Sequence, residues 1–360
     1  SQLLFGTFLG GSDSSNQGFS LQLDSAGQAV VAGKTTSSEF PTTPGSYDIS
    51  HNGNTDVFVV KLSADGSSLL FSTFVGGGDI DTGRSLVLDN LGQVVVSGTT
   101  SSSNFPTTPE SYDTDYNGGS IYTPWDTFVF KLSADGSSLI YSTFVGGSGD
   151  EDANSLALDN QGQAVVVGPT DSYDFPTTIE AYDDSYNGEE DAFVFKLSGD
   201  GKDLVYRTFL GGSASETGNA VALDSSGQAV IAGDTDSLDF PATPGAYDTS
   251  HNNSIDIFIV KLAATGSALV SSTFVGGKYA DEAPALTLDS DGQVVVTGYT
   301  ASSNFPATSL TEFATCQVSN LFILKLASAG DSLLYSTCVG GSSGSEYGHA
   351  VALNLSLIHI

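Results

Sequence analysis

Leu139-Ile-Tyr-Ser-Thr-Phe-Val-Gly-Gly147 is the stretch that decides the fold, because its second half recurs along the chain. Phe-Pro and Leu-Asp-x-x-Gly-Gln also recur, once in each interval and always in the same order. A fixed order of phrases at a fixed spacing is the signature of a repeat architecture. The Thr-Phe/Cys-Val/Leu-Gly-Gly phrase begins at Thr7, Thr73, Thr143, Thr208, Thr273 and Thr337.

Each repeat of about 65 residues reads as four β-strands. In the unit from Gly218 to Gly277, strands are predicted at 220–224, 229–232, 256–262 and 268–275, joined by Asp/Gly-containing turns. No segment has a sustained helical period. Four antiparallel strands at regular spacing predict an all-β protein, a β-propeller of four-stranded antiparallel blades. A β-solenoid has shorter repeats, and separate sandwich domains are longer.

The repeat also predicts the domain organisation. We expect one propeller domain over residues 1–354, with five full blade units and a partial unit at each end, as a piece of a six- or seven-bladed propeller. Residues 355–360 depart from the repeat, and we interpret this tail as an artefact of the sequence rather than a native segment. The blade units are 12–77, 78–147, 148–212, 213–277 and 278–341, and the partial units are 1–11 and 342–354.

The charge excludes two classes of partner. The 360 residues contain 42 Asp and Glu against 10 Lys and Arg, a formal net charge of −32. Nucleic-acid binding needs cationic side chains to neutralise phosphates, and an anionic membrane surface would repel this chain. The apolar runs are too short for membrane insertion. We therefore expect neither nucleic acid nor membrane as a partner.

The repeated phrases resemble the bacterial SBBP repeat family. The resemblance rests on Gly-Gly-Ser-Gly-Asp-Glu-Asp at 146–152, Phe-Pro-Thr-Thr-Pro-x-x-Tyr-Asp at 40–48, Leu-Asp-x-x-Gly-Gln-x-Val-Val and Asp-x-Phe-Val-x-Lys-Leu. It implies a propeller, often seven-bladed, on a secreted or cell-surface multidomain bacterial protein. We expect a monomeric module of a larger protein. The family implies no established catalytic residue, so none is assigned.

A polar ladder precedes the third strand of four units, with oxygen-bearing side chains at alternate positions followed in most units by Gly. This spacing suggests a calcium loop, although the bidentate Glu of an EF-hand is missing. Asx-turns leading into a strand explain the same residues and are favoured. The candidate calcium ligands are Asp48, Ser50, Asn52, Asp56, Asp113, Asp115, Asn117, Asp183, Ser185, Asn187, Asp191, Asp248, Ser250, Asn252 and Asp256.

A second acidic set falls in the segments between units, which the blade topology places near the central channel. These carboxylates could bind cations or a cationic partner, but solvated surface acidity is the favoured reading. A glycosidase using paired carboxylates is an alternative, although no acidic residue stands out from its repeat equivalents. The channel-side acidic residues are Asp79, Asp81, Asp150, Asp152, Glu216, Asp281, Glu282 and Glu346.

The sequence predicts interactions for three further sets of residues. One Lys in each third strand, such as Lys61, is expected to pair with the Asp that ends each first strand, such as Asp24. Tyr122 and Trp125 lie in an insertion and could stack on a sugar ring, with loop packing as the alternative. Cys316 and Cys338 lie in one unit and form either a disulfide or two buried thiols.

These observations together predict a non-enzymatic extracellular or cell-surface module. Its long-loop face would bind a protein or glycan ligand, with calcium as a possible cofactor. A carbohydrate-active propeller using loop carboxylates and a structural spacer in a large surface protein are the alternatives. A catalytic site would gather unlike residues from different blades into one pocket, which separates the first two hypotheses.

Overall fold

The fold is described from a computed structural model of the chain. It describes residues 5–12, 15–118, 125–252, 254–308, 316, 319–340 and 345–353. All regular secondary structure in these ranges is β-strand. Within them, no helix is long and apolar enough to cross a membrane.

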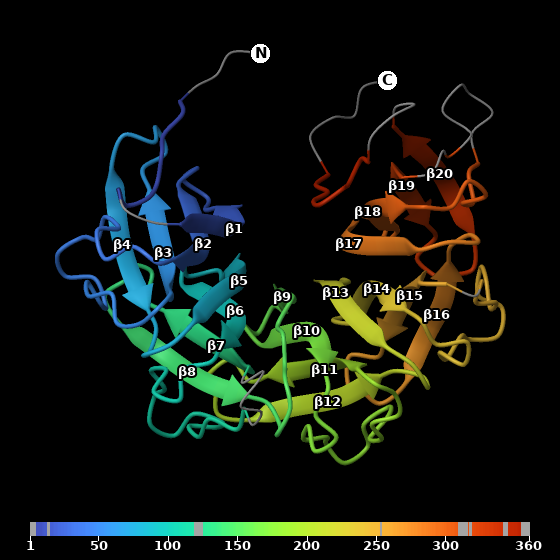
Figure 1. The fold of residues 1–360 in the computed structure, drawn as a ribbon, viewed down its shortest axis with the longest axis horizontal. Coiled ribbons are helices and arrows are strands. Elements are labelled where there is room, and N and C mark those ends of the chain that lie inside the picture. The colour runs from blue at the N-terminus through green and yellow to red at the C-terminus, as the bar shows by residue number, and fades with distance from the viewer. Residues whose placement is uncertain are drawn as a thin grey trace. The chain divides into compact units, whose positions relative to one another are not determined.

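Twenty strands form five four-stranded antiparallel sheets, each in sequence order (Figure 1). The first sheet contains β1 (Asn16–Leu23), β2 (Ala29–Thr35), β3 (Asp56–Leu62) and β4 (Leu69–Val75). The second contains β5 (Asp81–Leu88), β6 (Val94–Thr100), β7 (Asp126–Leu132) and β8 (Leu139–Val145). The third contains β9 (Ser155–Leu158), β10 (Ala164–Thr170), β11 (Asp191–Leu197) and β12 (Leu204–Leu210).

The last two sheets repeat this plan. The fourth sheet contains β13 (Glu216–Leu223), β14 (Ala229–Thr235), β15 (Asp256–Leu262) and β16 (Leu269–Val275). The fifth contains β17 (Asp281–Leu288), β18 (Val294–Thr300), β19 (Asn320–Leu326) and β20 (Leu333–Val339). The long connection in each sheet joins the second strand to the third, as the repeat predicts.

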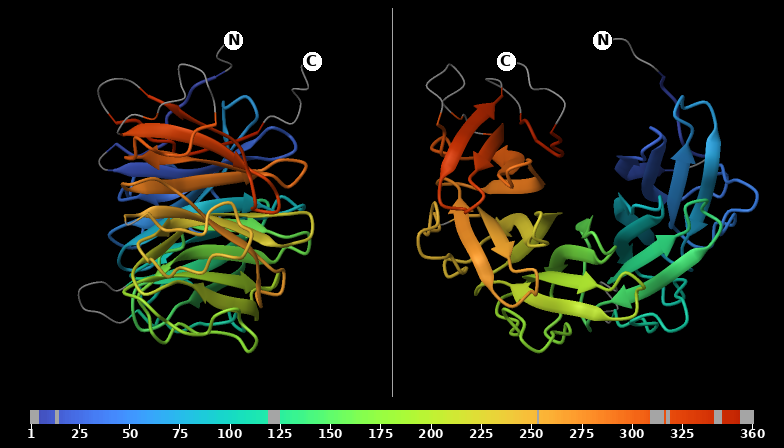
Figure 2. Two further views of the ribbon diagram at one scale, coloured as in Figure 1. Left: turned by 90° about the vertical axis from the view of Figure 1, so that its right-hand side faces the viewer. Right: turned by 180° about the vertical axis from the view of Figure 1, so that it is seen from behind.

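Two compact units divide the chain. The first consists of residues 1–164, 172–176 and 197–204, and the second of residues 165–171, 177–196 and 205–360. In the first unit β5 packs against β1, β2 and β3, and in the second β17 packs against β13, β14 and β15. Figure 2 shows the strands of each unit from two further sides. Successive sheets inside a unit therefore share a core.

The recurring phrases make the turns and the core. In the Leu-Asp-x-x-Gly-Gln phrase, Asp24 Oδ1 accepts hydrogen bonds from the backbone N–H groups of Ala26 and Gln28, both at 2.9 Å, which closes the first hairpin. Gly27 has φ of 75° there, a left-handed conformation that favours glycine.

The Phe-Pro phrase supplies a buried aromatic ring to each sheet. Phe40 stacks on Phe58 of β3 with ring centroids 4.6 Å apart, and Phe105 stacks on Phe128 of β7 at 4.4 Å. The long loop is thereby pinned to the third strand, whose residues are all buried in four of the five sheets.

Candidate functional site

The polar ladder forms Asx-turns. Asp48 Oδ1 accepts a hydrogen bond from the backbone N–H of Ser50 at 2.8 Å, and its Oδ2 accepts one from Asn52 Nδ2 at 2.6 Å. The first of these bonds recurs at Asp113, Asp183 and Asp248, from the backbone N–H groups of Asp115, Ser185 and Ser250. The described residues hold no group of three or more His, Cys, Asp or Glu that could bind a metal ion. Calcium binding by the ladder stays a prediction.

Asp56 is the last position of the first ladder. It is the first residue of β3 and has no exposed surface. Its Oδ2 accepts a hydrogen bond from the backbone N–H of Asn52 at 2.8 Å, whereas its Oδ1 is buried without a hydrogen-bond partner. A buried, unsatisfied carboxylate oxygen is costly and calls for an explanation.

The neighbouring carboxyl is that of Asp81 from the next repeat. A β-carbon at Gly76 would lie 2.7 Å from Asp56 Oδ1 and 2.9 Å from Asp81 Oδ2, so both oxygens flank this glycine. Asp81 accepts hydrogen bonds from the backbone N–H of Gly77 at 2.7 Å, from Ser102 Oγ at 3.1 Å and from Thr100 Oγ1. Two carboxyls that the sequence placed in separate sets therefore form one buried pair.

Equivalent carboxyl pairs lie at three further junctions between repeats. At these junctions a β-carbon on the first glycine of the Gly-Gly phrase would lie 2.1–2.3 Å from the carboxyl that begins the preceding third strand. At the last junction an amide takes the place of that carboxyl, and Gly340 lies between Asn320 and Glu346. The remaining pairs are Asp126 with Glu151, Asp191 with Glu216, and Asp256 with Asp281.

Burial favours the protonated form of these acids. Loss of hydration raises the pKa of Asp81, Asp126, Asp191 and Asp281 to about 6 each and also raises the pKa of Asp56 and Asp256. Asp126 Oδ1 and Glu151 Oε2 both flank Gly146, where a β-carbon would lie 2.3 and 2.5 Å from them. A hydrogen bond between two carboxyls would require a proton on one of them.

Three acids that were predicted to lie in exposed channel-side loops lie elsewhere. Asp81, Glu216 and Asp281 are the first residues of β5, β13 and β17, and none has any exposed surface. The prediction missed their partners, a Thr-x-Ser motif at the end of each second strand, exemplified by Thr100 and Ser102. That motif recurs in all five units and was visible in the sequence.

The other predicted acids are more accessible. Asp79 and Glu282 are exposed, whereas Asp150, Asp152 and Glu346 are partly buried. Asp152 lies just before β9 and accepts hydrogen bonds from Arg84 and Thr99. These side chains, unlike the buried pairs, have surface on which a ligand could bind.

The side chains that a ligand could contact lie at positions where the sequences of the repeats differ. Gly and Thr recur at the ends of the first two strands, but the residues between them change from unit to unit. One such position holds Phe19, Arg84, Asn154, Asn219 and Pro284 in successive units, and another holds Lys34, Thr99, Pro169, Asp234 and Tyr299. This variation between equivalent positions is the signal in the sequence that indicates a ligand site.

Asp234 is an acid at one of these variable positions, where the other repeats carry no acid. It accepts hydrogen bonds from the backbone N–H of Ala283 at 2.8 Å and from Asn219 Nδ2 at 2.5 Å. Burial raises the pKa of Asp234 to about 7, and the nearby Glu282 and Asp281 add to the shift.

The predicted aromatic pair is only partly described. Tyr122 lies outside the described residues. Trp125 is partly buried, and its backbone is fixed by two hydrogen bonds. Its N–H donates to Asp150 Oδ1 at 3.1 Å, and its carbonyl accepts from the N–H of Glu151 at 3.0 Å.

The Lys of the third strand forms an ion pair with the Asp that follows the first strand, as four units show. Lys61 Nζ lies 2.9 Å from Asp24 Oδ2, and Lys131 Nζ lies 2.8 Å from Asp89 Oδ2. The same pairing joins Lys261 to Asp224 and Lys325 to Asp289. These side chains are largely buried, so four lysines serve the frame rather than a ligand.

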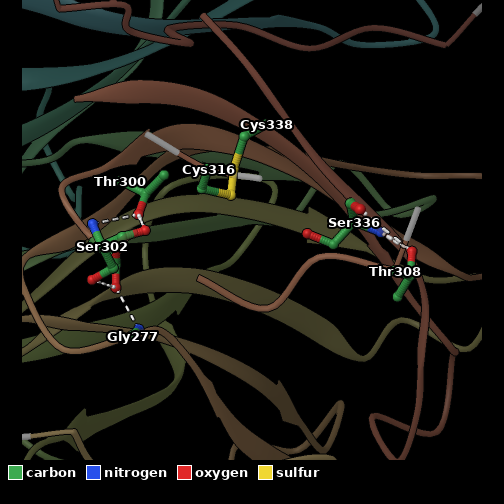
Figure 3. Close-up of a disulfide and its surroundings, with 8 residues drawn as sticks. Gly277, Thr300, Ser302, Thr308, Cys316, Ser336 and Cys338 are labelled. Carbon is green, nitrogen blue, oxygen red and sulfur yellow. Dashed lines mark hydrogen bonds between the residues drawn. A yellow bond between two sulfur atoms is a disulfide. The ribbon is translucent and has the colours of Figure 1, made fainter. Parts of the chain in front are cut away.

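The two cysteines form a disulfide in the fifth sheet's unit. The bond joins Cys316, in the connection between β18 and β19, to Cys338 on β20 (Figure 3). In the same view Thr308 and Ser336 tie this connection to β20 through backbone and hydroxyl hydrogen bonds. The disulfide therefore fastens a connection that has lost the polar ladder.

No family model and no curated protein matches the chain. Solved structures similar to it include the NanB sialidase of Streptococcus pneumoniae, at 10% identity and a TM-score of 0.48 over 93% of this chain and 62% of that one. Quinohemoprotein alcohol dehydrogenase from Comamonas testosteroni is 10% identical, with a TM-score of 0.46 over 89% and 52%. The Dos1 propeller is 11% identical, with a TM-score of 0.39 over 92% and 64%.

Five successive four-stranded antiparallel sheets make the chain a β-propeller protein, as the sequence predicts. It spans 62%, 52% and 64% of the three solved chains. At these identities the similarity extends to the fold alone, so function has to be argued from the residues of this chain.

Proposed function

We propose that the chain is a non-enzymatic binding module of an exported bacterial protein, whose ligand contacts side chains that differ between repeats. The burial of the repeated carboxyls carries this proposal. Asp56, Asp81, Asp126 and Glu151 have no exposed surface. A general acid or nucleophile must come within hydrogen-bond reach of its substrate, and these buried carboxyls are inaccessible to one.

The distribution of charge supports the same function. The exposed acids Asp79 and Glu282 and the partly exposed ladder keep the loops acidic, in a chain of net charge −32. Such loops, held on a rigid frame, suit a protein or glycan ligand. Export follows from the resemblance to the SBBP repeats and is part of the proposal.

Binding without turnover is the test. The purified chain is incubated with a panel of plant, bacterial and host oligosaccharides, and new reducing ends are counted while binding is measured by isothermal titration calorimetry. We expect heat of binding for at least one member and no new reducing ends. Cleavage that is abolished in Asp81→Asn would overturn the proposal, because it would make a buried pair catalytic.

A further inference from the structure

A cleft of about 380 Å³ lies inside the first compact unit. Residues from β1, β2, β5 and β6 and from the segments before β7 and β9 line it. Its volume falls within the roughly 300–1,000 Å³ typical of small-molecule sites. The side chains that matter are Phe19, Lys34, Arg84, Thr99, Trp125 and Asp152.

These side chains break the repeat. Phe19 and Arg84 occupy equivalent positions in successive units, and so do Lys34 and Thr99. Trp125 is the single tryptophan of the chain. The cleft thus gathers unlike residues on a frame whose other features recur, which is what a ligand site on a repeat scaffold requires.

Lys34 is a cation with no carboxylate partner in the part of the chain that the structure describes. Its Nζ lies 5.8 Å from the centroid of the Phe19 ring. In a chain with 42 acidic and 10 basic residues, an unpaired ammonium group at the edge of a cleft is available to an anionic ligand.

Arg84 offers a second set of donors. Its Nε donates to Thr99 Oγ1 at 3.4 Å and its Nη2 to Asp152 Oδ1 at 3.3 Å, whereas its Nη1 has no hydrogen bond to any residue in the described ranges. The Arg84 side chain is 39% exposed and that of Asp152 is 42% exposed. A guanidinium held by two long bonds can turn its free edge to a carboxylate, and Asp152 Oδ2 can accept from a hydroxyl.

Aromatic surface completes the site. Phe19 is 45% exposed, and the backbone of Trp125 is fixed on both sides by hydrogen bonds. Rings of this kind stack on the apolar face of a pyranose, while the polar groups around them recognise hydroxyls and charge.

We propose that this cleft binds an acidic saccharide, a uronic-acid unit of a glycan chain. Its carboxylate would be held by Lys34 and Arg84, a hydroxyl by Asp152, and its ring by Trp125. This inference rests on the proposed function and names the ligand class of that module.

The test compares trigalacturonate with its fully methyl-esterified form, which keeps the rings and removes the charge. Isothermal titration calorimetry of the whole chain at pH 7.5 should give a Kd of about 1 mM or tighter for trigalacturonate. The ester should bind at least about tenfold more weakly. Lys34→Gln and Trp125→Ala should each weaken trigalacturonate binding by about tenfold.

Lys278→Gln is the matched control. Lys278 Nζ lies 5.5 Å from the Tyr279 ring in the same cation–ring arrangement, and it does not line this cleft. This variant should bind trigalacturonate as the natural chain does. Unchanged melting temperatures would show that all three variants fold, and Lys34→Gln keeps the test valid if Trp125→Ala does not fold.

Three results would overturn the inference: equal binding of acid and ester, equal behaviour of Lys34→Gln and Lys278→Gln, or no binding of either trigalacturonate or triglucuronate. If another ligand binds the chain and binds Trp125→Ala equally well, its site lies outside the cleft. That result would overturn the inference and leave the proposed function intact. Cleavage of a glycan would instead contradict the proposed function.

Discussion

Asp56 and Asp81 come from consecutive repeats and meet with no exposed surface on either residue. The Oδ1 of Asp56 has no hydrogen-bond donor, and Asp81 is surrounded by hydroxyl and backbone donors. Burial raises the pKa of both carboxyls, that of Asp81 to about 6. Two ionised carboxyls buried side by side would repel each other, and a proton on one of them removes that charge.

The close approach of this pair to Gly76 should require glycine at the first position of the Gly-Gly phrase. Gly76→Ala places a β-carbon 2.7 Å from Asp56 Oδ1 and 2.8 Å from its Cγ, so the carboxyls must move. We expect a loss of about 2–4 kcal/mol in the free energy of unfolding, measured by chemical denaturation. Gly78→Ala is the control, because its nearest neighbour would be a flexible Asn104 oxygen at 3.3 Å. Equal losses in the two variants would contradict the assignment.

Asp56→Asn should stabilise the protein at alkaline pH. The fifth repeat already carries Asn320 at this position, opposite Glu346. An amide can donate a hydrogen bond to the opposing carboxylate and removes one buried charge. We expect a gain of about 1–3 kcal/mol at pH 8 by urea denaturation. Asp79 is an exposed acid in the connection between β4 and β5, and Asp79→Asn should change stability by less than about 0.5 kcal/mol.

Breaking a largely buried ion pair should be costly. Lys131 and Asp89 have side chains 8% and 10% exposed, with 2.8 Å between Nζ and Oδ2. Asp89→Asn leaves the ammonium group buried without its counter-ion, which we expect to lower the free energy of unfolding by about 3 kcal/mol. Asp135→Asn, an exposed turn residue, is the comparison. A loss below about 1 kcal/mol in Asp89→Asn would show that the pair is well solvated.

Reduction of the disulfide should destabilise the last repeat. Cys316 and Cys338 are 22 residues apart, a loop length for which cross-linking contributes about 3 kcal/mol. Thermal melts with and without a reductant should differ, and the Cys316→Ser/Cys338→Ser double variant should melt like the reduced protein and be insensitive to reductant. Identical melts of the oxidised and reduced protein would contradict this expectation.

The repeat made the sheets predictable because every element carried its own signal: alternating strands, Asp/Gly turns and the buried Phe-Pro ring. The carboxyl pair was not predicted, since its two halves lie about 25 residues apart in different repeats and only packing brings Asp56 to Asp81. The Thr100 and Ser102 donors were equally visible but had no assigned partner. Trp125 and Asp152 of the cleft were named from the sequence, whereas Lys34 and Arg84 were not, because neither residue recurs at the equivalent position of the other repeats.

The pH dependence of stability tests the protonation of the buried carboxyls most directly. A carboxyl whose pKa rises from 3.8 in the unfolded chain to about 6 in the folded one binds its proton more tightly when folded. Its contribution to stability is complete below about pH 4 and is lost as the pH rises through 6. The lowered pKa values of acids such as Asp24 and Asp89 have the opposite effect on stability, because their contribution is lost as the pH falls below about 4.

The decisive measurement is the melting temperature from pH 4.5 to pH 8.5 for the natural chain, for Asp56→Asn/Asp256→Asn and for the control Asp79→Asn/Glu282→Gln. The two variants lose the same number of charges, from buried and from exposed sites respectively. We predict that the melting temperature of the natural chain and the control falls as the pH passes through 6, and that the buried-site variant falls less. Three parallel curves, or a melting temperature that rises with pH, would contradict the account.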